Sequence, residues 1–439
     1  MRVATVVVLL VALGPRSVPG QEQHVIRLTL EEAIDRAIAH APRLRQLGAR
    51  ESAAERAVSK AQAGEKPQVE LSAGYTRYSD VPEFVVATIE GGTEALFPNI
   101  PDNARARVGA SYPLYTGGRT GGEVEAARGE MRSAEDRLEA ARRDLVLETR
   151  EAYWGLVTSE QLVAVLAENL TAFEAHLVDA RNRERFGLAA RNEVLAVEVE
   201  RDRAELDRLR AETSSRLARA NLARLLGLGP EEMVEPAENL SPFAVSAEDS
   251  EALVSLALQN RPELSALRAQ VAAAEARARV EKSTILPQVS VGAGYIYAHP
   301  NARYLPPVAE WNDNWEVGVN MALNLFDGGR ASAGEARARA EAEATRAELA
   351  DLEERIRLEV LSALLEVENA EASVEVSGRA LEAATESRRV AADRYREGVI
   401  LSSELLDAEV ALLRAGLDRT QALAAQHLAA AALDRALAR

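Results

Sequence analysis

The residue types that most often carry chemistry are few in this chain, and they are scattered along it. Its 439 residues include no cysteine and only five histidines. The histidines are His24, His40, His176, His299 and His427. None lies in an H-E-x-x-H motif, and without cysteine there is no thiolate ligand or nucleophile. The sequence therefore predicts no catalytic residue, no metal site and no cofactor, and we expect the protein not to be an enzyme.

Two glycine-rich motifs could be taken for phosphate-binding loops. PLYTGGRTGG begins at Pro113 and NLFDGGR begins at Asn324. Neither contains the lysine of the G-x-x-x-x-G-K-[ST] pattern. Each instead follows alternating apolar and polar residues and precedes a long segment rich in Ala, Glu, Arg and Leu. We interpret them as junctions where a strand becomes a long helix.

Backbone freedom at the paired glycines would allow this change of conformation. The glycines are Gly117, Gly118, Gly328 and Gly329. Pro113 has no amide N–H to donate, so we expect it to end the strand ladder before the first junction.

The charge balance limits the classes of partner that the protein can bind. The chain has 69 acidic and 52 basic residues, a net charge of -17. Phosphate binding needs a basic face, so we expect no nucleic-acid partner. Hydrophobic residues make up 47%, but aromatic residues only 4%. This composition favours long helices packed through small side chains over several compact cores.

The N-terminus has the pattern of a secretory signal. Arg2 precedes an apolar run from Val3 to Leu13, and small residues lead to Gly20. A membrane-spanning helix needs about 20 apolar residues, so this run is too short to be an anchor. We expect residues 1–20 to be a cleaved signal peptide, and no other stretch to span a membrane as a helix.

The rest of the chain is an internal duplication. Pro42 aligns with Pro262, and PQV at Pro67 aligns with PQV at Pro287, both at an offset of 220 residues. The glycine motifs align at an offset of 211 residues, which continues to the end of the chain. The first repeat covers residues 21–240 and the second covers residues 241–439.

Each repeat contains two candidate strands with strict alternation. They cover about residues 67–78, 104–115, 287–298 and 314–326. A period of two over about ten residues gives one apolar and one polar face, as in outer-membrane barrels. A half-buried sheet in a soluble protein is the alternative for any one strand. The polar segments 79–103 and 299–313 read as external loops.

Each repeat also contains a helical hairpin. The long helices are expected over about 119–186 and 330–397, the turns at 187–191 and 398–402, and the return helices over about 192–227 and 403–438. At 1.5 Å per residue each long helix would span roughly 100 Å. Apolar residues at spacings of three and four predict a coiled-coil seam, with alanine allowing close approach.

Four strands cannot close a barrel alone. They leave two edges whose backbone groups are costly to expose in lipid. The fold class expected is therefore an α+β membrane protein in which several chains share one barrel. Two copies would give eight strands, three would give twelve and four would give sixteen. The residues alone do not decide between these numbers of copies.

The double repeat, both junction motifs and the turns RFGLAARNEVL and YREGVILSSELL resemble the TolC family of outer-membrane efflux proteins. The resemblance covers essentially the whole mature chain. It implies a homotrimer with a 12-stranded barrel in the outer membrane of a Gram-negative bacterium and a periplasmic α-barrel of coiled-coil helices. It also implies an export duct of a tripartite efflux or type I secretion system. Its partners would be a periplasmic adaptor (membrane fusion) protein, an inner-membrane pump of RND or ABC type and outer-membrane lipid.

The resemblance further implies site residues at the helix turns. Adaptor docking would use Gly187 and Leu188 in the first turn and Gly398 and Val399 in the second. These glycines could alternatively only cap their helices.

The entrance gate would include Asn192, Glu193, Tyr395, Glu404 and Asp407. Glu404 and Asp407 share a helix face, so three copies would make acidic rings, which favour cations. A solvated helix face is the plainer interpretation.

One position departs from the family pattern. Where the resemblance implies a basic residue that closes the gate, the chain has Ile400, and we expect Arg191 or Arg396 to take that role. Function also has an alternative: an exported periplasmic helical adaptor or scaffold that does not insert in the membrane. The sequence discloses neither the cargo nor the energy source of the pump.

Overall fold

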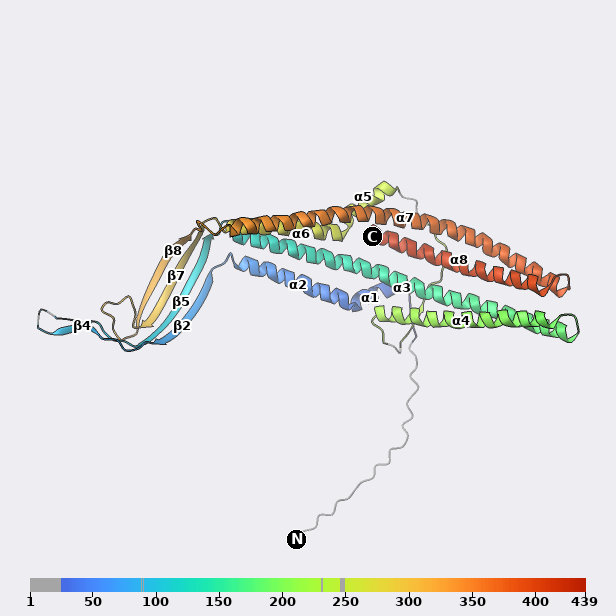
Figure 1. Cartoon of the computed structure of the whole chain (residues 1–439), viewed down its shortest axis with the longest axis horizontal. Coiled ribbons are helices and arrows are strands. Elements are labelled where there is room, and N and C mark those ends of the chain that lie inside the picture. The colour runs from blue at the N-terminus through green and yellow to red at the C-terminus, as the bar shows by residue number, and fades with distance from the viewer. Residues whose placement is uncertain (1–24, 88, 90, 230–231, 245–248) are drawn as a thin grey trace, which may run out of the picture. The chain divides into compact units, whose positions relative to one another are not determined.

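The computed structural model describes residues 25–87, 89, 91–229, 232–244 and 249–439 (Figure 1). The expected signal peptide, residues 1–20, lies outside the described residues. The chain divides into two compact units. Unit 1 combines Met1–Ala41, Val146–Val245 and Val367–Ala431, and unit 2 combines Pro42–Leu145, Ser246–Glu366 and Ala432–Arg439. The units do not coincide with the two sequence repeats, because each repeat contributes segments to both.

The described strands are β1 (Val25–Leu28), β2 (Gln68–Arg77), β3 (Phe84–Ala87), β4 (Thr93–Phe97), β5 (Asp102–Tyr115), β6 (Met233–Pro236), β7 (Gln288–His299) and β8 (Asn312–Ala322). The described helices are α1 (Leu30–His40), α2 (Pro42–Ala63), α3 (Arg119–Arg185), α4 (Arg191–Leu225), α5 (Ser250–Asn260), α6 (Pro262–Ser283), α7 (Arg330–Arg396) and α8 (Ser402–Ala436). None of the helices in the described part of the chain has a stretch that is both long and apolar enough to cross a membrane.

Four strands of unit 2 form one antiparallel sheet in the order β2-β5-β7-β8 (Figure 1). The register keeps the sequence alternation over most of the sheet, so that Arg107, Ser290 and Asn320 share one face. Ile296 and Ala298 interrupt this polar face near one end of β7. Apolar residues occupy the other face, where Val69 is 72% exposed and Trp315 is 73% exposed. Such a wide exposed apolar face requires lipid or another protein to cover it.

Pro113 does not end the strand ladder, and the expectation that it does is wrong. β5 continues to Tyr115, which pairs with Val289 of β7 after a register shift between Pro113 and Tyr115. On the other side the ladder between β5 and β2 already stops at Ser111. No ladder hydrogen bond from position 113 to β2 is therefore required. On the side of β7, the register shift accommodates the N–H that proline lacks.

The sequence interpretation omitted several short elements. β3 and β4 make a hairpin within the expected loop 79–103. β1 pairs in parallel with β6, which lies more than two hundred residues further along the chain. The helices α1 and α5 precede α2 and α6, and each is separated from the next helix by one residue before a proline. That proline is the first residue of the next helix. An N–H at this position has no partner within the helix, so proline costs no helical hydrogen bond there.

The helices of unit 2 lie side by side in the order α2-α3-α6-α7. Polar contacts join each neighbouring pair: Arg43–Asp144 at 3.7 Å, Gln270–Ser133 at 2.9 Å and Arg268–Glu353 at 3.2 Å. The end of α8 meets the start of α6, where Arg261 Nε donates to the Ala436 carbonyl at 2.8 Å. The largest buried side chains include Leu264 and Ile356.

In unit 1 the order is α4-α3-α8-α7. The contacts between neighbours are Arg219–Glu160 at 2.6 Å, Ser402–His176 at 3.2 Å and Arg388–Glu409 at 2.9 Å. Tyr153 of α3 is fully buried, and its hydroxyl donates to the Leu28 carbonyl at 3.1 Å. That contact ties the pair of β1 and β6 to the helices.

Candidate docking tips and entrance

Both strand-to-helix junctions use glycine in a left-handed conformation. The φ values are 64° at Gly117, 87° at Gly118, 70° at Gly328 and 87° at Gly329. Other residues enter this region at a cost, which explains why glycine stands at these four positions.

A polar side chain just before each glycine pair caps the long helix. Asp327 accepts hydrogen bonds from the Gly329 and Ala331 amides at 2.9 and 2.8 Å. The Ala331 and Gly329 amides lower the pKa of Asp327, although partial desolvation opposes them. Thr116 occupies the equivalent position in the first repeat and accepts from the Thr120 amide at 3.4 Å. These side chains satisfy amides that have no partner within the helix.

Each long helix ends in the same glycine turn. The Gly187 amide donates to the Glu184 carbonyl at 2.9 Å, and the Leu188 amide donates to the Arg183 carbonyl at 2.8 Å. The second turn repeats both bonds at Gly398 and Val399, at 3.0 and 2.9 Å. Glycine with φ of 73° and 75° at these positions closes a Schellman motif.

Apolar side chains at the two turns point into solvent. Phe186 is 75% exposed, Leu188 76%, Val399 60% and Leu401 65%. We call these four residues the tip patch. Because exposed apolar residues often mark a protein interaction site, the tip patch on the two turns is a candidate docking surface.

Arg183 joins the two hairpins in unit 1. Its guanidinium carbon lies 4.2 Å from the centre of the Tyr395 ring. The same group donates to the carbonyls of Tyr395 and Arg396 at the end of α7. A cation at the C-terminal end of a helix is favoured, because the last carbonyls carry partial negative charge.

His176 is buried beside this contact. Its ring centre lies 5.1 Å from that of Tyr395, and its Nε2 lies 3.2 Å from the Ser402 hydroxyl. Burial lowers the pKa of His176, and the nearby Arg183 lowers it further while Asp179 raises it. Burial raises the pKa of Tyr395. Both rings are therefore held neutral at the contact between hairpins.

No group of three or more His, Cys, Asp or Glu side chains within the described ranges is arranged to hold a metal ion. A family model described as "Outer membrane efflux protein" matches residues 33–228 and 253–439. The chain belongs to this family. The resemblance to TolC-type proteins and the expected location, the outer membrane with a large periplasmic portion, are thereby confirmed.

Relatives of the outer membrane efflux protein family agree with this assignment. The chain is 29% identical over 302 residues to protein CyaE of Bordetella pertussis, covering 69% of this chain and 61% of the relative. It is 24% identical over 303 residues to outer membrane protein TolC of Vibrio cholerae, covering 68% and 65%. The matches thus span less than two thirds of the length of these relatives.

Among solved structures, outer membrane protein VceC of Vibrio cholerae has a TM-score of 0.78 and is 22% identical, covering 93% of this chain and 95% of that one. This similarity confirms the expected α+β fold.

Within this efflux-family fold, the expected gate residues occupy different environments. Asn192 is exposed and Glu193 is half-buried in the first turn of α4, while Glu404 and Asp407 are exposed on α8. The Leu401 amide donates weakly to Glu404 at 3.5 Å, so this carboxylate also caps its helix. Tyr395 is only 4% exposed and belongs to the contact between hairpins.

Arg191 and Arg396, the arginines expected to take the role of the basic residue absent at position 400, each pair with a nearby carboxylate. Arg191 pairs with Glu184 at 3.4 Å and Arg396 pairs with Asp393 at 2.8 Å, each within its own hairpin. Ile400 is buried in an apolar cluster with Tyr395 and Leu405. The sequence reasoning missed Arg183, although its position four residues before the Gly187 turn is a signal that a basic residue meets the last carbonyls of a helix.

Proposed function

We propose that the chain is one subunit of a homotrimeric outer-membrane channel that serves as a passive export duct. The observation that carries this proposal is the free edge on each side of the main sheet. β2 and β8 are the outer strands, and within the described residues neither has a partner on its outer side. In lipid, unpaired backbone groups cost several kcal/mol each, so both edges need a partner.

The strand directions allow copies of the chain to supply that partner. All neighbours in the order β2-β5-β7-β8 are antiparallel, so β2 and β8 run in opposite directions. β8 of one copy can therefore pair with β2 of the next in the same antiparallel pattern. Such a contact uses two different surfaces and repeats around a ring until it closes.

The outer helices carry apolar residues that fit the same arrangement. In unit 1, Leu206 and Leu217 of α4 are 53% and 68% exposed. In unit 2, Leu358 and Leu365 of α7 are 67% and 54% exposed, and α2 has no buried residue. Leucines at these positions gain free energy when a neighbouring copy covers them, at about 25 cal/mol per Å² of apolar area.

Barrel size and the resemblance to TolC-type proteins support three copies. Eight strands leave a barrel interior filled by side chains, so a dimer would leave little passage. Three copies give twelve strands, and the resemblance to TolC-type proteins favours three. The polar face of each sheet would then line the lumen, and the apolar face would meet lipid.

The proposed partners are a periplasmic adaptor protein and an inner-membrane pump of RND or ABC type. The tip patch supports docking of the adaptor, with Gly187, Leu188, Gly398 and Val399 at the contact. Glu404 and Asp407, with Asn192 and Glu193, would line the entrance. In this proposal the chain performs no chemistry itself, and the pump supplies the driving force of a tripartite efflux or type I secretion system.

Two neighbouring residues of the outer strand β8 provide the test. Val319 lies on the apolar face and Asn320 on the polar face. Arginine on the lipid face costs about 2–4 kcal/mol at the middle of a bilayer, but little in a lumen. We expect Val319→Arg to lower the amount of assembled protein in the outer-membrane fraction, and Asn320→Arg to leave it near the parent level.

Single-channel recording of the purified parent protein completes the test, with discrete conductance steps as the expected result. Equal outer-membrane yields of the two arginine variants, or a parent protein recovered as a soluble periplasmic monomer, would contradict the proposal. The second outcome would favour the alternative of a helical adaptor or scaffold.

A further inference from the structure

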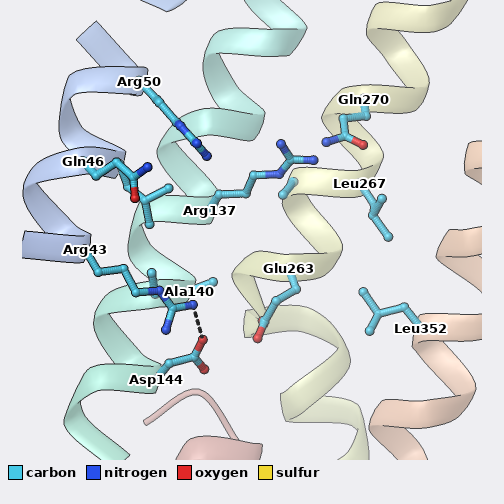
Figure 2. A pocket seen from close by; sticks show the side chains of 13 residues that line it. Arg43, Gln46, Arg50, Arg137, Ala140, Asp144, Glu263, Leu267, Gln270 and Leu352 are labelled. Carbon is cyan, nitrogen blue, oxygen red and sulfur yellow. Dashed lines mark ion pairs between the residues drawn. The ribbon is translucent and has the colours of Figure 1, made fainter. Parts of the chain in front are cut away.

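Unit 2 contains an open groove between its helices, with a volume of about 480 Å³. Residues of α2, α3 and α6 line it, together with Leu352 of α7 (Figure 2). This volume falls within the range of roughly 300–1,000 Å³ that is usual for small-molecule sites. Its apolar part is formed by Leu47, Ala140, Ala141, Ala266, Leu267 and Leu352.

One end of the groove is electrically balanced. Asp144 accepts from Arg435 at 2.6 Å and lies 3.7 Å from Arg43. Glu263 pairs with Arg435 and also lies 3.4 Å from Arg261. Both carboxylates that line the groove are therefore neutralised by arginines, and neither is left to repel an anion.

The other end carries uncompensated positive charge. Arg50 of α2 and Arg137 of α3 line the groove, and no ion pair joins either to a carboxylate of the described residues. Figure 2 shows their side chains directed toward the same part of the groove, together with Gln270 of α6. Two arginines with no acidic partner therefore share one groove in a chain whose net charge is -17.

Arginines nearby on the same helix pair are compensated. Arg277 and Arg279 of α6 pair across the interface with Glu130 and Glu125 of α3.

Arg45 and Arg132 of α2 and α3 also lack an ion pair among the described residues, but they lie outside the groove. What distinguishes Arg50 and Arg137 is that both line the same groove beside its apolar residues. A guanidinium offers a planar set of donors that matches carboxylate, sulfonate or phosphate oxygens.

We propose that this groove binds a single-chain amphiphilic anion. The anionic head would lie between Arg50 and Arg137, and the aliphatic tail would lie along the apolar residues toward Leu352. An amphiphilic cation would be repelled by the two arginines, and a small hydrophilic anion would gain nothing from the apolar part. The site goes beyond the proposed duct, since passive conduction requires no binding groove in the helical wall.

The test is calorimetric titration of the full-length protein in nanodiscs of zwitterionic lipid with octane-1-sulfonate. Saturable binding is expected. Arg50→Gln with Arg137→Gln should weaken it by roughly tenfold or more, because charge-assisted hydrogen bonds are lost. The matched control is Arg45→Gln with Arg132→Gln, which removes the same charge from exposed positions of α2 and α3 outside the groove. That control should bind as the parent does.

Two further ligands and one further variant complete the design. Octyltrimethylammonium and ethanesulfonate should show no saturable binding at the concentrations where octane-1-sulfonate saturates. Arg50→Lys with Arg137→Lys keeps both charges but loses the planar donors, so it should bind more tightly than the glutamine variant and less tightly than the parent, which separates loss of charge from misfolding.

Equal affinity in the glutamine variant and the parent would overturn the proposal, as would equal binding of the ammonium ligand. Nanodiscs containing phosphatidylglycerol distinguish a bilayer lipid from a soluble amphiphile. If that lipid occupies the groove while octane-1-sulfonate never saturates, the proposed occupant is wrong.

Discussion

Arg183 and Tyr395 join the two helical hairpins through a guanidinium that lies 4.2 Å from the ring centre. The same guanidinium donates to the Tyr395 and Arg396 carbonyls at the end of α7. Tyr395 in turn packs with Ile400, where the family pattern implies a basic residue. The contact between hairpins in this chain is therefore a buried aromatic ring held by an arginine of the other repeat.

Arg183→Gln is expected to loosen this contact and to raise the single-channel conductance. The substitution removes a cation–π contact of about 0.5–1 kcal/mol and hydrogen bonds from a charged donor, each about 1.5–3 kcal/mol. Arg185→Gln is the matched control, because Arg185 is exposed in the same helical turn. Identical conductance in both variants and the parent would show that the contact does not hold the entrance.

His176 is expected to make unit 1 less stable in mild acid. Burial lowers its pKa in the folded chain below the ordinary value near 6.5. Below pH 6.5 the unfolded chain therefore takes up a proton that the folded chain does not, so stability falls until the lower, folded pKa is reached.

Melting temperatures measured between pH 8 and about pH 5 should fall less steeply for His176→Asn than for the parent. His40→Asn changes an exposed histidine and should follow the parent curve. Parallel curves for all three proteins would remove His176 as a cause of acid sensitivity.

The first glycines of the two junctions should differ in their tolerance of alanine. Gly117 and Gly328 have similar φ values of 64° and 70°. A Cβ at position 117 would lie 2.7 Å from the Leu286 Cβ, whereas a Cβ at position 328 would meet no atom within 4 Å. Gly328→Ala should cost about 1–2 kcal/mol from the left-handed backbone alone.

Gly117→Ala should cost roughly 1–3 kcal/mol more from overpacking. Thermal unfolding of the purified variants measures the difference between them. Equal melting temperatures would mean that Leu286 moves aside freely, and that the close approach at Gly117 is not required.

Neutralising Glu404 and Asp407 together, as Glu404→Gln with Asp407→Asn, is expected to reduce the cation preference of the channel. Both side chains are exposed on one face of α8, and three copies would place six carboxylates around the entrance. Reversal potentials in a salt gradient measure the preference. The control, Glu368→Gln with Glu382→Gln, removes two exposed acids of α7 and should change it little. An equal shift in both variants would remove the assignment of Glu404 and Asp407.

The long periodic elements could be predicted from the sequence because their patterns extend over many residues. The long helix expected over about 119–186 is observed as Arg119–Arg185, and the strand expected over about 287–298 is observed as Gln288–His299. Alternation with period two and apolar spacings of three and four are local signals, and both repeats carry them.

The missed features depend on contacts between distant residues. β1 has only four residues, and its parallel partner β6 lies in another part of the chain. Nothing local marks such a pair. Arg183 and Tyr395 lie more than two hundred residues apart, so only the fold reveals their contact. Pro113 was misjudged for a related reason, because the ladders on the two sides of β5 end at different residues.

The number of chains in the assembled channel tests the central claim most directly. Native mass spectrometry of the protein released from outer membranes in mild detergent measures it. We predict one dominant species with about three times the protomer mass, since a closed ring pairs every free β2 edge with a β8 edge and the resemblance favours three copies. A stable monomer inserted in lipid, with both sheet edges unpaired, would contradict the account.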